Sequence, residues 1–194
     1  SCSTDGTFSD EEMTLTHQRE AGDLTEEDII AVFAEYSRSF EKVSPYYNNV
    51  LRSYRAGATE EEIRRSEDMR RVVSEMHEPS IQLFKNLRFS EEDNFEIFGH
   101  RFLSDATAED VVGGGLLLYS FQTNGSGYDF IDCFLEVTGI SAGIALVGGL
   151  TGAAGGPALV KAFKTVVTKV GIRTLSGIGL ALMAAEFTWC MLRD

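Results

Sequence analysis

The sequence is poor in cysteine, proline and positive charge. Its 194 residues include three cysteines, three prolines and one tryptophan, and 17 lysines and arginines stand against 30 aspartates and glutamates. Nucleic-acid binding depends on clustered basic side chains that displace counterions from phosphates, so a formal net charge of −13 argues against that class of function. We therefore expect no nucleic-acid partner.

Several motifs of common enzyme and metal sites are also missing. The sequence contains no His-Glu-x-x-His, no Cys-x-x-Cys and no glycine-rich loop that ends in Gly-Lys-Ser or Gly-Lys-Thr. The glycines at 113–115 have no lysine nearby, which does not fit a phosphate loop. Glu96 and His100 are spaced to share one face of a helix and could begin a metal site, but two ligands are too few. We predict a non-enzymatic protein without a metal or cofactor.

Charge is distributed unevenly along the chain. Residues 1–136 carry 28 acidic and 12 basic side chains, whereas residues 137–194 carry 2 acidic and 5 basic ones. The change begins with an uncharged run of 24 residues at 137–160, which contains seven glycines. A run of this length is typical of a membrane span or of a buried hairpin.

The glycine-rich run predicts close helix packing. Gly148, Gly152 and Gly156 recur every four residues, so their bare faces align and another backbone can approach. Many glycines and few strongly apolar residues make a stable membrane span marginal. We therefore favour a hairpin buried against the preceding helices. The alternative is insertion into a membrane, with contacts to anionic lipid from basic residues that follow the run. These residues are Lys161, Lys164, Lys169 and Arg173.

This part of the chain resembles the circular bacteriocins. The likeness lies in the glycine-rich residues 139–156, in Leu-Val-Lys-Ala-Phe-Lys at 159–164 and in Lys-Val-Gly-Ile-Arg at 169–173. The resemblance implies a membrane-active protein, either bacteriocin-like or pore-forming, whose C-terminal hairpin enters lipid. The acidic region before it would then mask the cationic part until release.

Helix signals dominate from Leu24 onward, whereas strand signals are thin. Thr25 predicts a helix cap, and an apolar stripe follows it at helical spacing. Ser44 and Pro45 predict a second helix start, and Gly57 an end. The stripe consists of Ile29, Phe33, Tyr36 and Phe40.

Three further starts follow Gly57. Thr59 and Glu62 form a capping box that opens a helix up to Pro79, and cap-like starts recur at Ser90 and Thr107. The sequence thus predicts an all-α helical bundle of several short helices with a Gly-rich apolar C-terminal hairpin. We divide it into a flexible polar tether at 1–23, an acidic helical region at 24–136 and the hairpin region at 137–194, the last two packed as one domain.

Cys2 differs from the other cysteines because it lies in a polar, acidic segment that cannot bury a thiol. Ser1, Cys2 and Ser3, followed by Asp5, resemble the cleavage region of bacterial surface lipoproteins of the Bacteroidetes type. The resemblance implies that Cys2 receives lipid, that Ser1 belongs to a leader, and that the protein is exported. It would then be an outer-membrane lipoprotein or face the periplasm.

Cys133 and Cys190 form the remaining pair, each in an apolar setting on either side of the glycine-rich run. Two interpretations stay open for them. An exported chain would meet an oxidising compartment, where the pair can form a disulfide, or the two thiols can serve as small buried apolar groups. We expect a secreted cell-envelope lipoprotein that binds an unidentified ligand or protein partner, or has a structural role. The alternative is the membrane-active protein.

Overall fold

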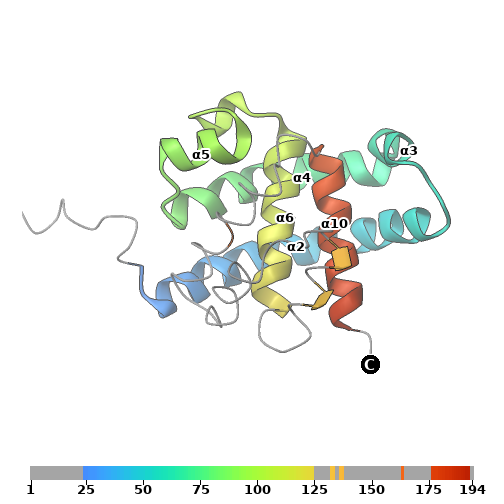
Figure 1. Cartoon of the computed structure of the whole chain (residues 1–194), viewed down its shortest axis with the longest axis horizontal. Coiled ribbons are helices and arrows are strands. Elements are labelled where there is room, and N and C mark those ends of the chain that lie inside the picture. The colour runs from blue at the N-terminus through green and yellow to red at the C-terminus, as the bar shows by residue number, and fades with distance from the viewer. Residues whose placement is uncertain (1–23, 125–131, 134–135, 138–162, 164–175, 193–194) are drawn as a thin grey trace, which may run out of the picture.

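The computed structural model describes residues 24–124, 132–133, 136–137, 163 and 176–192. Within these ranges the chain forms six α-helices, one short 3-10 helix and no strand, which confirms the all-α bundle (Figure 1). The 3-10 helix spans Leu103–Asp105. The α-helices are α2 (Glu26–Arg55), α3 (Glu60–Arg65), α4 (Glu67–Asn86), α5 (Glu91–Phe98), α6 (Ala108–Asn124) and α10 (Gly177–Met191).

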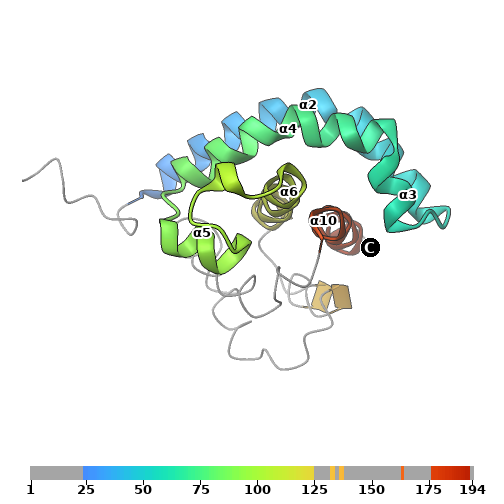
Figure 2. The same ribbon diagram turned by 90° about the horizontal axis from the view of Figure 1, so that it is seen from above.

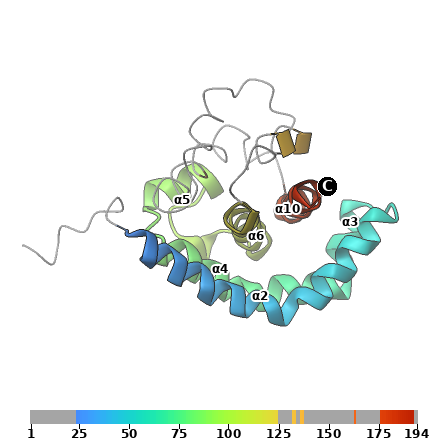
Figure 3. The same cartoon turned by 90° about the horizontal axis from the view of Figure 1, so that it is seen from below.

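Helices α2 and α4 lie side by side and form a curved outer layer. The concave side of this layer faces α6 and α10, while α5 and α3 lie at its two ends (Figures 2 and 3). Both helices are amphipathic, so one stripe enters the core and the charged face meets solvent. The predicted stripe of α2 is buried at Ile29, Phe33 and Tyr36, and Phe40 packs against the core while partly exposed.

The predicted restart at Ser44 and Pro45 is wrong, because α2 continues through both residues. A proline in a helix removes the N–H that would bond the carbonyl four residues earlier, here that of Glu41. The Ser44 hydroxyl donates to the Glu41 carbonyl oxygen at 3.1 Å and so satisfies this acceptor. The helix therefore tolerates Pro45 within its curved course.

The single helix predicted from Thr59 to Pro79 is also wrong. The chain breaks at Ser66, whose extended backbone ends α3 and caps α4, and its hydroxyl accepts from the Met69 N–H at 3.2 Å. Helix α4 then continues past Pro79 to Asn86. The break turns α3 away from α4 at one end of the layer (Figure 2).

The other predicted helix boundaries agree with the structure. Thr25 and Ser90 form reciprocal capping boxes with the residues three positions later, and Thr59 accepts from the Glu62 N–H at 3.1 Å. Thr107 accepts likewise from Asp110 at 3.2 Å. Gly57 follows the end of α2 with a φ of +97°, a conformation that favours glycine.

Helices α6 and α10 form an inner pair that runs in the same direction, and their first turns meet. A Cβ added at Gly113 would lie 2.2 Å from the carbonyl oxygen of Gly177. One added at Gly177 would lie 2.1 Å from the carbonyl carbon and oxygen of Glu109. The two glycines thus let the backbones come into direct contact, as small residues do at close helix crossings.

Aromatic rings fill the space around the inner pair. The Phe84 and Phe98 rings meet edge to face at a centroid distance of 5.3 Å, and Phe121 and Phe187 do so at 5.1 Å. Edge-to-face pairs stabilise a core beyond the area they bury. Phe163 is fully buried and links these two pairs through its contacts with Phe84 and Phe121.

Candidate functional site

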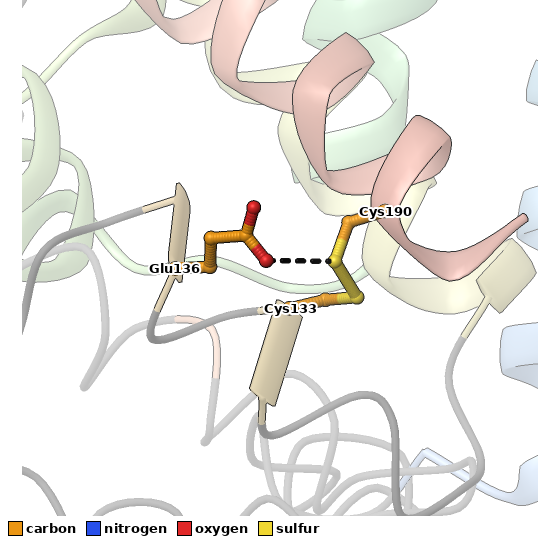
Figure 4. The surroundings of a disulfide bond; sticks show 3 residues. All are labelled: Cys133, Glu136 and Cys190. Atoms are coloured by element: carbon orange, nitrogen blue, oxygen red, sulfur yellow. Dashed lines mark hydrogen bonds between the residues drawn. A yellow bond between two sulfur atoms is a disulfide. The ribbon is translucent and has the colours of Figure 1, made fainter. Parts of the chain in front are cut away.

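A disulfide joins Cys133 to Cys190 near the end of α10. The two sulfur atoms are 1.99 Å apart, the Cα atoms are 5.5 Å apart, and both cysteines are almost completely buried (Figure 4). Sequence left two interpretations open for this pair, and the structure shows the disulfide rather than two free thiols. It fixes Cys133 against the last turn of α10.

The carboxylate of Glu136 lies beside this bridge. Its Oε2 atom is 3.6 Å from Sγ of Cys190, the contact drawn as a dashed line in Figure 4. A sulfur in a disulfide carries no hydrogen, so this contact is not a hydrogen bond donated by Cys190. The bridge instead positions Glu136 and its neighbour Val137 close to α10.

The last turn of α2 reaches the same end of α10. The Tyr54 hydroxyl donates to Oε1 of Glu186 at 2.5 Å. This hydrogen bond raises the pKa of Tyr54 to about 12, with smaller contributions from burial and from the negative charges of Glu186 and Glu60. Tyr54 therefore remains a neutral donor at physiological pH.

The only tryptophan of the chain lies at this junction. The guanidinium carbon of Arg55 is 3.7 Å from the centroid of the Trp189 ring, which places a cation on the face of the indole. The Tyr54 ring is nearly parallel to the indole, at an angle of 15° and a centroid distance of 6.5 Å. The ends of α2 and α10 are thus held together by stacking and by the Tyr54–Glu186 hydrogen bond.

A pocket of about 430 Å³ opens between these groups. Its lining combines one guanidinium, two carboxylates, an indole and the edge of the disulfide, and this combination makes it the candidate functional site. We call it the junction pocket. It is lined by Arg55, Glu136, Val137, Glu186, Trp189 and Cys190. Comparison with protein-family models, with curated proteins and with solved structures finds no match to this chain. The site must therefore be interpreted from its own geometry.

A second groove of about 200 Å³ lies between α2 and α4. Its lining includes two carboxylates but no lysine, arginine or histidine, and the other polar side chains are one serine, one tyrosine and two amides. It therefore offers a ligand fewer kinds of charged side chain than the junction pocket does. The groove is lined by Val32, Glu35, Tyr36, Ser39, Glu78, Pro79, Gln82, Leu83 and Asn86.

Most of the candidate site residues named from the sequence lie outside the described residues. They are Cys2, Gly148, Gly152, Gly156, Lys161, Lys164, Lys169 and Arg173. The uncharged run at 137–160 is described only at its first residue. No helix within the described ranges is long and apolar enough to cross a membrane.

The pairing of Glu96 with His100 on one helix face is wrong. Helix α5 ends at Phe98, and Gly99 follows with a φ of +77°, so His100 lies beyond the helix. Both side chains are exposed. Among the described residues, no group of three or more His, Cys, Asp or Glu side chains is arranged to hold a metal ion.

The sequence analysis did not identify the junction pocket. It assigned no role in a site to Tyr54 or Glu186. Nothing local marks Arg55 or Glu136, because their partners are more than 50 residues away. The one available signal was Trp189, a single tryptophan directly before a cysteine.

Proposed function

We propose that this chain is a non-enzymatic binding module of the bacterial cell envelope, held at a membrane by lipid on Cys2. The polar residues 1–23 would serve as a tether, and the helical domain would bind a ligand at the junction pocket. One acyl chain anchors weakly, whereas several acyl chains anchor firmly.

The observation that carries this proposal is the disulfide between Cys133 and Cys190. Disulfides persist in exported proteins and are rare in reducing compartments. Lipid attachment at Cys2 also requires export, so the two features support the same location. The pocket supports binding because its side chains can hold a ligand by charge and by stacking.

The anchor can be tested by expressing the gene with its own leader and separating detergent and aqueous phases. The native chain should enter the detergent phase, whereas Cys2→Ala should remain aqueous. Ser3→Ala is the matched control and should behave as the native chain. Equal partitioning of the native chain and Cys2→Ala would contradict the proposal. So would salt-sensitive dye release from anionic vesicles by the chain without lipid, since that result favours the membrane-active alternative.

A further inference from the structure

Among the described residues, two arginines lie over aromatic rings, and they differ in what their N–H groups contact. Arg71 lies over Tyr46 at 4.2 Å, and its Nε is 3.1 Å from a Glu75 carboxylate oxygen. Arg55 lies over Trp189 at 3.7 Å. Across the ranges that the structure describes, no carboxylate comes within 4 Å of the Arg55 guanidinium.

Arg55 lines the pocket and is exposed, so its contact with Trp189 leaves its hydrogen-bonding edge available. Stacking uses the face of a guanidinium, whereas its five N–H donors point outward in the plane of the group. Contact with Trp189 also limits the conformations of the side chain, so less freedom is lost when a ligand binds. Arg55 is therefore arranged to hold a carboxylate or a similar oxyanion by paired hydrogen bonds.

The two carboxylates of the pocket oppose a simple anion. Glu136 and Glu186 line the same space as Arg55, so the three ionic side chains carry one positive and two negative charges. An anion would gain the guanidinium but would be repelled by both acids. A ligand that also carries a cation can place it near these acids, since a carboxylate accepts several hydrogen bonds even when it already has a partner, as Glu136 and Glu186 both do.

We propose that the junction pocket binds a small zwitterion of the α-amino acid class, with its carboxylate on Arg55 and its ammonium group beside Glu136 and Glu186. The volume of about 430 Å³ lies near the small end of ligand pockets, which suits a free amino acid or another compact zwitterion. This proposal rests on the proposed binding function. It does not depend on the lipid anchor.

Trp189 provides a specific probe, because its fluorescence is the only tryptophan signal of the chain. The oxidised full-length chain is titrated with L-alanine, glycine betaine, sodium acetate and methylammonium chloride at matched ionic strength. Calorimetry of the same titrations detects binding that leaves the fluorescence unchanged. L-alanine should saturate, and each singly charged compound should bind at least about tenfold more weakly. The ammonium group of glycine betaine has no N–H. If betaine binds as tightly as L-alanine, the two carboxylates select positive charge rather than N–H donors.

Three variants test the assigned contacts. Arg55→Lys keeps the charge but loses the planar donor edge, so L-alanine should bind about tenfold more weakly. Arg71→Lys is the matched control, because Nε of Arg71 already donates to Glu75 and Arg71 lies outside the junction pocket, so it should leave binding unchanged. Glu136→Gln should reduce the preference for L-alanine over acetate. Circular dichroism and the urea midpoint verify that each variant folds.

Several results would overturn the proposal. Acetate that binds as tightly as L-alanine would show an anion site without zwitterion selection. If Arg55→Lys and Arg71→Lys lose the same amount of L-alanine affinity, binding does not take place at the junction pocket. Saturation by none of the four compounds in either measurement would also refute it. The detergent-phase experiment would remain unaffected, so failure of this proposal can be distinguished from failure of the lipoprotein assignment.

Discussion

The outer layer and the inner pair bury their side chains in different ways. Helices α2 and α4 each place one apolar stripe in the core and present charged residues to solvent. In α6 the whole run at 111–118 is buried, and α10 is almost entirely apolar. The outer helices thus make a boundary between core and water, whereas the inner helices have little contact with water.

This difference explains where charged and polar side chains can lie close together. The middle of the inner pair is covered by the outer layer, so few charged groups can be hydrated there. At its C-terminal end, α10 meets the last turn of α2 and the residues held by the disulfide. Glu186 and Trp189 are therefore only partly buried, Arg55 is exposed, and all three can contact a ligand.

The largest expected effect concerns the bridge that holds the inner pair at this end. The double variant Cys133→Ala/Cys190→Ala should lower the free energy of unfolding by about 4 kcal/mol, because the disulfide closes a loop of nearly 60 residues in the unfolded chain. Urea unfolding of the oxidised wild type and of the variant measures this difference. Cys2→Ala, which leaves the bridge intact, is the control.

The bridge should also affect the pocket, because it positions Glu136 and Val137. In the double variant, the emission of Trp189 should change under conditions in which the far-ultraviolet circular dichroism is preserved. Unchanged emission together with an unchanged urea midpoint would show that the inner pair does not depend on the bridge.

The same contrast explains how much of the fold could be predicted from sequence. The caps at Thr25, Thr59 and Ser90 were predictable because each depends on residues three positions apart. The stripe from Ile29 was predictable because α2 alternates between core and solvent. The inner helices lack this alternation, and glycines 113–115 were considered only as a phosphate loop, although they pack against other helices.

Long-range partners limited the rest of the prediction. The continuation of α2 through Pro45 depends on tertiary burial of Val43, Tyr47 and Val50, while the Ser44 hydroxyl replaces the hydrogen bond that proline removes. The site depends on contacts between residues separated by more than 100 positions, such as Tyr54 and Glu186. Spacing within a segment carries no information about such pairs. The disulfide was considered only because two cysteines remained after Cys2 had been assigned.

The contact between the inner helices can be broken without changing charge. Gly113→Ala places a Cβ 2.2 Å from a backbone oxygen of α10, so the two helices must separate. We expect a loss of about 1–3 kcal/mol in unfolding free energy, as overpacking outweighs the better helix propensity of alanine. Gly179→Ala is the matched control, because the nearest atom to its Cβ is a serine hydroxyl oxygen at 3.3 Å. Equal urea midpoints for both variants would contradict direct backbone contact.

The smallest expected effect concerns the Tyr54–Glu186 hydrogen bond between the two regions. Tyr54→Phe removes it and should cost about 1 kcal/mol, because the bond involves a charged acceptor but is partly exposed. The folded pKa of Tyr54, about 12, lies above the ordinary value of 10. The contribution is therefore fully present below pH 10 and is lost as the pH rises through 12.

Urea unfolding of wild type and Tyr54→Phe, both in a Cys2→Ala background, should therefore differ by a constant amount up to pH 10 and converge above it. The background removes a thiol that would otherwise attack the disulfide at alkaline pH. Burial also raises the pKa of Tyr36 and Tyr47, but both phenols are present in the two proteins, so their effect cancels in the difference. Tyr46→Phe serves as the control, since that ring supports Arg71 at the other arginine–aromatic pair. A difference that stays constant up to pH 12 would show that ionisation of Tyr54 does not weaken the contact between the outer layer and the inner pair.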